Sequence, residues 1–198
     1  MSALALLEFP SVTDGVLAVD RLLKAAPVAV LRSGTVHPGR FLLLAGGSVA
    51  STEAGYRAAE AAAAPLDGVL LPDPHPDLAA LLREPGGRAV PNADLLVVEH
   101  DTSPRLVRDL DATLKAVPLA LAVLRLADDL GGRAFGVLTG DLADLEDAAG
   151  LLAARPVPPR TVVVARPDPE LRAALSATTL YRDAPLRSLP DGERVPEV

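Results

Sequence analysis

The chain has 198 residues, contains no cysteine and no tryptophan, and is only 3% aromatic. The absence of cysteine excludes disulfides, thiolate metal sites and cysteine-ligated iron–sulfur clusters. Apolar residues nevertheless reach 49% of the chain. The core is therefore predicted to consist mainly of Ala, Leu and Val, whose small side chains suit close packing between helices, sheets and neighbouring subunits.

The sequence also lacks a basic run and a long apolar run. Its formal net charge of −7 argues against nucleic acid and against an anionic membrane surface as partners. The longest apolar runs, around residues 41–45 and 58–65, are much shorter than the roughly 20 residues of a membrane-spanning helix. The first residues lack the basic segment and cleavage site of a signal peptide. We therefore expect a cytosolic protein.

The most informative feature present is an internal repeat. Residues 20–27 return as residues 111–118 with Asp, Leu, Lys, Ala and Pro at matching places, an offset of 91 positions (111 − 20). After an insertion of two residues, expected near Ala122, the offset becomes 93. A repeat this long indicates two tandem domains. The pairs at the longer offset include Leu31 with Leu124, Arg40 with Arg133, Gly47 with Gly140, and Pro74 with Pro167.

The two halves have the same predicted order of elements. In each half, apolar runs, capping residues and turn residues predict strand, helix, strand, strand, helix and strand, followed by a short helix. This is the order of a ferredoxin-like α+β domain, with both helices on one face of a four-stranded sheet. The predicted domains span residues 1–88 and 93–182, and residues 183–198, rich in proline and charge, are expected to form an exposed tail.

No residues with the pattern of a catalytic or metal site stand out. The three histidines, His37, His75 and His100, lack metal-ligand spacing, and the glycine-rich turns match neither a P-loop nor a dinucleotide-binding motif. The aspartates show no pairing with a nucleophile or base, so solvated surface positions explain them better. We therefore predict no catalytic residue, no metal and no cofactor.

The repeated pattern resembles the tandem-domain, trimer-forming shell proteins of bacterial microcompartments. The matching features are a first strand ending in Glu, a helix ending in the Asp-x-x-Leu-Lys-Ala-x-Pro pattern, a Gly-containing loop between two strands, and a Gly before an Ala-rich helix. A proline-rich turn then follows at residues 72–75 and 165–168. Each feature is weak alone, but all of them occur in order, twice.

The resemblance implies that three chains form a flat pseudohexagonal disc with a central pore that passes small metabolites. Its expected partners are copies of itself and the hexameric and pentameric tiles of the same shell, inside the cytoplasm. Carboxylates at the rim would attract cations, and a protonated His37 would oppose them. The positions that the resemblance places at the pore are Val36, His37, Pro38, Gly39, Asp128, Asp129, Leu130, Gly131 and Gly132.

The resemblance also places five residues at the outer edge, where tiles meet: Lys24, Lys115, Asp73, His75 and Arg166. Because Asp73 stands where the second copy has Arg166, we expect unlike edges, one with Lys115 and Arg166 and one with Lys24 and Asp73. For the two lysines, favourable charge at a helix C-terminus is the simpler explanation. For the loops, ordinary turn geometry is the simpler explanation.

Two other functions stay open at this point. The first is a cytosolic ligand-binding or regulatory trimer with ferredoxin-like domains, which would bind a small molecule between subunits. The second is an enzyme with an inter-subunit site, although no plausible catalytic set supports it.

Overall fold

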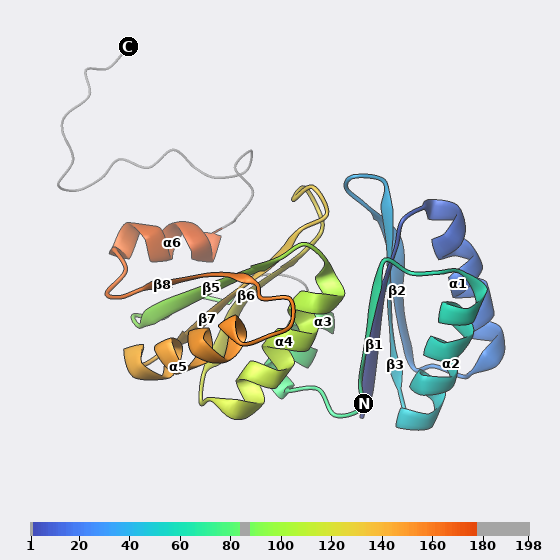
Figure 1. The fold of residues 1–198 in the computed structure, drawn as a ribbon, viewed down its shortest axis with the longest axis horizontal. Helices are drawn as coiled ribbons and strands as arrows, with labels where there is room; N and C mark the ends of the chain where they lie inside the picture. Colours follow the sequence, from blue (N-terminus) through green and yellow to red (C-terminus); the bar gives the residue numbers. More distant parts are fainter. Residues whose placement is uncertain (1, 84–87, 178–198) are drawn as a thin grey trace, which may run out of the picture.

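The computed structural model describes residues 2–83 and 88–177, which form two four-stranded antiparallel sheets with helices (Figure 1). Each half has the order β-α-β-β-α-β followed by one more helix, so the predicted α+β class with two tandem ferredoxin-like domains is confirmed. The first half consists of β1 (Ala3–Phe9), α1 (Val12–Ala25), β2 (Val30–Val36), β3 (Arg40–Gly47), α2 (Val49–Ala62), β4 (Asp67–Leu71) and α3 (Pro76–Arg83). The second half consists of β5 (Asp94–His100), α4 (Ser103–Ala116), β6 (Ala120–Leu126), β7 (Ala134–Gly140), α5 (Leu142–Ala153), β8 (Arg160–Val164) and α6 (Pro169–Ala177).

The first sheet has the strand order β2-β3-β1-β4 and is covered on both faces. Successive side chains of a strand point to opposite faces. Along β1, Ala5, Leu7 and Phe9 therefore pack in the core beneath α1 and α2, whereas Leu4 and Leu6 belong to a second core on the opposite face. Burial on both faces explains why β1 is apolar at nearly every position.

The second sheet has the corresponding order, β6-β7-β5-β8. Leu96 and Val98 of β5 pack with the core of α4 and α5. On the other face, Leu95 packs with Val123 and with Leu175 of α6. The central strand of this sheet is therefore also covered on both sides.

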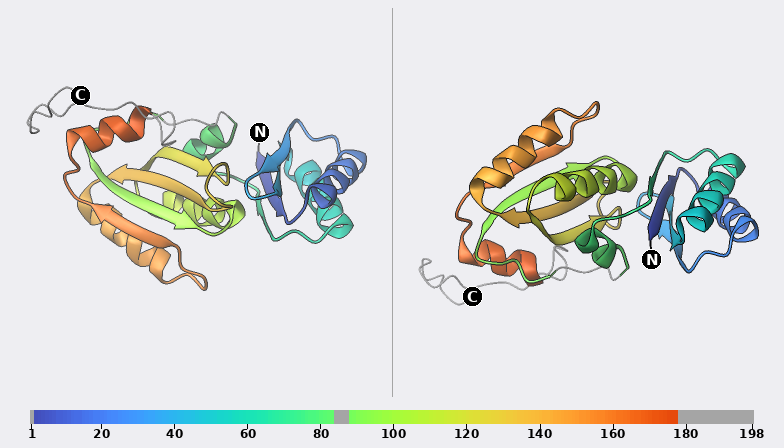
Figure 2. Two further views of the ribbon diagram at one scale, coloured as in Figure 1. Left: turned by 90° about the horizontal axis from the view of Figure 1, so that it is seen from above. Right: turned by 90° about the horizontal axis from the view of Figure 1, so that it is seen from below.

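Helix α4 lies between the two sheets. It covers its own sheet and also contacts β4 and β1 of the first sheet (Figures 1 and 2). Helix α3, which precedes the second half in sequence, packs against β6 and α4. One apolar cluster consequently extends from Leu6 through Leu78 and Leu81 to Leu96, so the two halves share a core.

The pairing of the strands corrects the position of the two-residue insertion. Gly34 pairs with Leu42, and Arg125 pairs with Phe135. Leu42 and Phe135 are equivalent at the offset of 93 (135 − 42), so Gly34 and Arg125 are equivalent at an offset of 91 (125 − 34). A register irregularity between Leu121 and Val123 disturbs the start of β6. The repeat pattern placed the insertion at this irregularity, but the two additional residues lie in the loop between β6 and β7. The predicted equivalence of Leu31 and Leu124 in the repeat is therefore wrong.

The helix caps agree with the sequence in α1 and differ by one residue in α4. Ser11 caps α1, and its hydroxyl accepts a 3.2 Å hydrogen bond from the Asp14 backbone N–H. In α4 the sequence offers Ser103 before Pro104 as a cap, but the cap in the structure is the preceding residue, Thr102. The Thr102 hydroxyl accepts a hydrogen bond from the backbone N–H of Arg105, so Ser103 is already part of the helix.

The boundaries 1–88 and 93–182 remain predictions, and the predicted tail, 183–198, lies outside the described residues. Among the helices of the described ranges, none is long and apolar enough to cross a membrane.

Candidate functional site: the junction between the two halves

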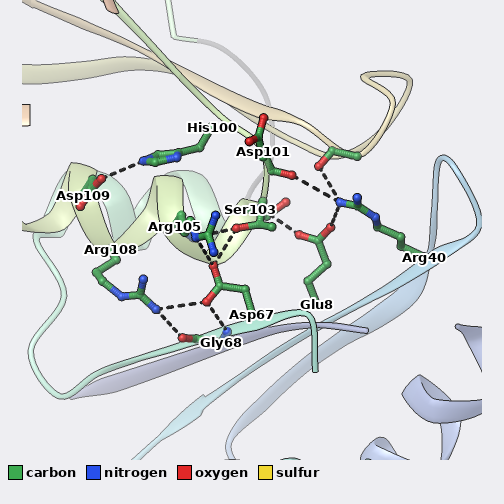
Figure 3. A network of polar contacts seen from close by, with 12 residues as sticks. Glu8, Arg40, Asp67, Gly68, His100, Asp101, Ser103, Arg105, Arg108 and Asp109 are labelled. Atoms are coloured by element: carbon green, nitrogen blue, oxygen red, sulfur yellow. Dashed lines mark hydrogen bonds and ion pairs between the residues drawn. The ribbon is translucent and has the colours of Figure 1, made fainter. Parts of the chain in front are cut away.

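A buried carboxylate, Glu8, joins the two halves at the end of β1 (Figure 3). Its Oε1 accepts a 2.7 Å hydrogen bond from Arg40 Nη1, and its Oε2 accepts a 2.9 Å hydrogen bond from the backbone N–H of Ser103. Ser103 opens α4, and a carboxylate is favoured near a helix N-terminus because the first N–H groups there have no partner within the helix. The ion pair and the helix end together compensate the burial of this charge.

A second carboxylate, Asp67 at the start of β4, holds the same end of α4 (Figure 3). It accepts a 2.7 Å hydrogen bond from the Thr102 hydroxyl and forms ion pairs with Arg105 and Arg108, each at 3.3 Å. Arg108 also donates a 2.6 Å hydrogen bond to the carbonyl of Gly68. The first sheet thus presents negative charge, and α4 presents positive charge, at their contact.

The loops predicted to line the pore lie next to each other at one end of the molecule. Figure 1 shows the β2–β3 loop and the β6–β7 loop rising on the same side, and the view from above in Figure 2 agrees. Arg40 connects the two hairpins, because its Nη1 donates to the carbonyl of Gly132 at 3.1 Å. A Cβ at Gly132 would lie 2.5 Å from Arg40 Nη1, and its φ of +84° also favours glycine.

Within these loops, the side chains expected at the pore are accessible. His37, Asp128 and Asp129 are exposed, and Val36 and Leu130 are partly exposed. Gly39 in the β2–β3 loop and Gly131 and Gly132 in the β6–β7 loop have positive φ. Pro38 precedes Gly39.

Three of the five predicted edge residues meet where the end of α4 contacts the turn after β4. Lys115 Nζ donates to the carbonyl of Asp73 and pairs with Asp111 at 2.7 Å. Asp111 also accepts a 2.7 Å hydrogen bond from the backbone N–H of His75. This contact lies between the halves of one chain, yet 43% of the Lys115 side chain stays exposed.

The remaining two edge residues are the counterparts of Lys115 and Asp73. Lys24 lies at the end of α1, and Arg166 lies in the turn after β8. Lys24 pairs only with Asp20 of its own helix in the described contacts, at 2.7 Å, and Arg166 is exposed after β8. The expected grouping set Lys115 with Arg166 and Lys24 with Asp73. The structure instead joins Lys115 to Asp73, because that turn and that helix end belong to neighbouring halves.

Helix α3 is held to the second half by Asp77. Its carboxylate accepts hydrogen bonds from Arg88 at 2.8 Å and from the backbone N–H of Leu121 at 3.4 Å. Burial by itself raises the pKa of Asp77, but these hydrogen bonds and the charge of Arg88 outweigh that effect, so the pKa is lower than usual.

Sequence reasoning placed Glu8 and Arg40 in the repeat but gave them no role, and it missed Asp67, Arg105 and Arg108. The signal available was the recurrence of Glu8 as Glu99 and of Arg40 as Arg133. His100, one of the three histidines without metal-ligand spacing, is buried, and its Nε2 lies 2.8 Å from Asp109 Oδ2. Among the residues that the structure describes, no group of three potential ligands is arranged to hold a metal ion.

Two β-α-β-β-α-β units that share a polar junction and present neighbouring hairpin loops at one end define a tandem-domain α+β protein. Residues 3–73 match the family model of the BMC domain. The chain is 29% identical over 171 residues to the bacterial microcompartment shell protein PduT of Citrobacter freundii. The aligned region covers 80% of this chain and 92% of PduT.

Solved structures agree with this comparison. A microcompartments protein from Desulfitobacterium hafniense DCB superposes with a TM-score of 0.75 and 28% identity, covering 86% of this chain and 98% of that one. The fused permuted hexameric shell protein MSM0275 from the RMM microcompartment shares the fold, with a TM-score of 0.53, 20% identity, and coverage of 74% and 81%. Residues 3–73 therefore carry a BMC domain, and most of the chain is similar in sequence and fold to bacterial microcompartment shell proteins. These relatives support a structural role in the shell of a microcompartment in the bacterial cytoplasm, and they do not favour the ligand-binding regulatory alternative.

Proposed function

We propose that three copies of the chain close head to tail into a flat pseudohexagonal tile with a central opening for small metabolites. The observation that carries this proposal is the position of the two hairpin loops, side by side at one end of the chain and connected by Arg40 and Gly132. Repeating one chain around a threefold axis would bring six such loops together. Head-to-tail contacts of this kind form closed rings when the rotation closes.

The opening would be lined by residues 36–39 and 128–132. The exposed carboxylates of Asp128 and Asp129 would attract cations, and the glycines would keep the side-chain volume at the opening small. His37 would add positive charge when protonated. The chain would therefore act by its shape and charge, without a catalytic step and without a cofactor.

Other shell tiles would be the partners at the outer edge. Lys115, Asp73 and His75 would form one kind of corner, because the structure joins their segments within the chain. Lys24 and Arg166 would meet only between chains and would form a second kind of corner. A tile with alternating corners could distinguish among its neighbours.

Light scattering on the purified protein, followed by negative-stain imaging of the same peak, tests the proposal. We expect a mass of three chains of 20.4 kDa each and a flat hexagonal disc with a central depression. A six-chain species would indicate stacked discs, and a protein that stays monomeric at all concentrations would contradict the proposal.

A further inference from the structure

The junction inside the chain shows how each half meets its neighbour, and the strand register identifies the counterpart of each residue. Glu8 pairs with Asp67 across β1 and β4, and Glu99 pairs with Arg160 across β5 and β8. Helix α1 corresponds to α4 at the offset of 91. The face of α4 that packs on the first half therefore has its counterpart on α1. The region of the first half that α4 contacts, around β4, has its counterpart around β8.

These counterparts are apolar and uncovered in the single chain. Val107 and Leu114 of α4 are 1% and 5% exposed, but their counterparts on α1, Val16 and Leu23, are 57% and 50% exposed. On the strand side, β4 is largely covered and β8 is largely open. Exposed apolar side chains grouped on one helix face indicate an interaction surface.

The strand side of this surface repeats the difference. Val69 is 5% exposed, whereas its counterpart Val162 is 54% exposed. The side chain of Glu8 is fully buried against α4, whereas that of Glu99 is 36% exposed and paired with Arg133 at 3.2 Å. The second half thus carries Glu99 as the counterpart of the carboxylate that accepts from the α4 N-terminus, and no helix of the described residues packs on it.

The loops give independent support. Arg40 reaches the second half at Gly132, where a Cβ would meet its guanidinium. Around Gly39, the counterpart of Gly132, a Cβ would meet nothing within 4 Å. Its backbone nevertheless has the same left-handed conformation, with a φ of +86°. The space at Gly39 suits Arg133 of another copy.

The charges at the two surfaces are reversed. Inside the chain, the strand carries Asp67 and the helix carries Arg105, whose Nε lies 3.3 Å from the carboxylate. At the uncovered surfaces, the strand carries Arg160 and the helix carries Asp14. Arg160 is 74% exposed and lies 4.0 Å from Glu99, while Asp14 accepts a 2.7 Å hydrogen bond from the hydroxyl of Ser11.

We infer that α1 of one chain docks on β8 of the next with Asp14 facing Arg160, and that this reversed charge pair sets the order of the halves around the ring. The inference rests on the proposed function, because it specifies the contact that closes the tile. The partner is a second copy of this chain.

The reversal excludes the two wrong contacts. Placing α1 on β4 would bring Asp14 against Asp67, and placing α4 on β8 would bring Arg105 against Arg160. Like charges facing each other across an interface disfavour a wrong partner. First and second halves would therefore alternate around the ring, and a ring made of first halves alone would be disfavoured.

Charge-exchange variants test the inference in the full-length protein. Arg160→Asp and Asp14→Arg each place like charges in contact, and we expect each to raise the chain concentration needed for half-assembly by roughly tenfold or more. The double variant restores an opposite pair and is expected to recover assembly. The mass is measured by light scattering over a dilution series, and circular dichroism checks that each variant is folded.

Arg57→Asp serves as the matched control. It makes the same change of charge on α2 of the first half, where the Arg57 side chain is 64% exposed and pairs with Glu60, and its counterpart Gly150 has open space around it. We expect this variant to assemble like the unmodified protein.

The outcomes separate the inference from the proposed function. If the unmodified protein forms trimers and the single variants also do at the same concentrations, the inference is wrong and the tile stands. The same conclusion follows if both single variants dissociate and the folded double variant does not recover. If the unmodified protein never forms trimers, the proposed tile is wrong and the inference fails with it.

Discussion

Glu8 Oε2 accepts a 2.9 Å hydrogen bond from the backbone N–H of Ser103, a residue 95 positions away. The carboxylate is fully buried, so its partners decide whether the junction holds. We expect Glu8→Gln to lower the free energy of unfolding by about 2–3 kcal/mol, because it removes the charge that Arg40 and the α4 N-terminus require. Urea denaturation measures the change.

Glu53→Gln is the control for this prediction. Glu53 is exposed on α2, so its substitution should change stability by less than about 0.5 kcal/mol. Equal effects of the two variants would show that the Glu8 contacts contribute nothing specific.

Asp77 should make the stability of the junction depend on pH. Its pKa is lowered in the folded state, so its contribution is fully present above the ordinary pKa of an aspartate, about 3.9, and is lost as the pH falls through the folded value. We expect Asp77→Asn to be less stable than the unmodified protein at pH 7, and the difference to shrink below about pH 4. Urea midpoints at several pH values measure this, and a difference independent of pH would contradict the assignment.

The paired leucines Leu114 and Leu23 should differ in their effect on folding. Leu114 is 5% exposed in the shared core, so Leu114→Ala is expected to cost about 2–3 kcal/mol. Leu23 is 50% exposed, so Leu23→Ala should change the stability of the single chain by less than about 0.5 kcal/mol. Thermal unfolding at concentrations below assembly compares them, and similar losses would show that Leu23 is buried within the single chain.

The loop aspartates should control the passage of charged solutes if the proposed opening exists. In assembled shells, we expect Asp128→Asn with Asp129→Asn to slow the entry of a small cationic probe by roughly tenfold, because the attracting field is removed. His37→Ala should act in the opposite direction, because it removes a side chain that opposes the carboxylates when it is positively charged. Asp147→Asn, exposed on α5, is the control. Unchanged flux in the loop variants would count against the opening.

Lys24 should matter for tiling rather than for folding. Its ion pair with Asp20 is exposed, and such pairs contribute about 0–1 kcal/mol. We expect Lys24→Ala to keep the trimer mass while losing the extended sheets seen by electron microscopy. Extended sheets of normal size would place Lys24 away from the contacts between tiles.

Sequence patterns predicted the elements because they depend on local periodicity, and the repeat supplied a second copy as a check. The apolar run of β1, the Ser11 cap and the order of strands all follow from neighbouring residues. The junction could not be predicted in the same way. Asp67 and Arg105 are 38 positions apart (105 − 67), and nothing in either local pattern shows that they meet.

The edge residues show the same limit. The repeat identified Lys24 and Lys115 as equivalent, but only the placement of one half against the other shows that Lys115 reaches Asp73. The insertion was misplaced for a related reason. The irregularity of β6 at Ala122 and the longer β6–β7 loop both change the alignment of the two halves. Only the pairing of β6 with β7 shows which of them contains the insertion.

The apolar cluster that passes from β1 through α3 to β5 has a consequence for how the chain unfolds. Halves that share one core lose it together, so unfolding should be a single cooperative transition despite the duplication. Cutting the chain after residue 88 would uncover Leu4 and Leu6 on one piece and part of the α4 face on the other. Each repeated unit is thus half of one folding unit, and we expect neither half to fold alone unless its uncovered core surface is replaced by a polar one.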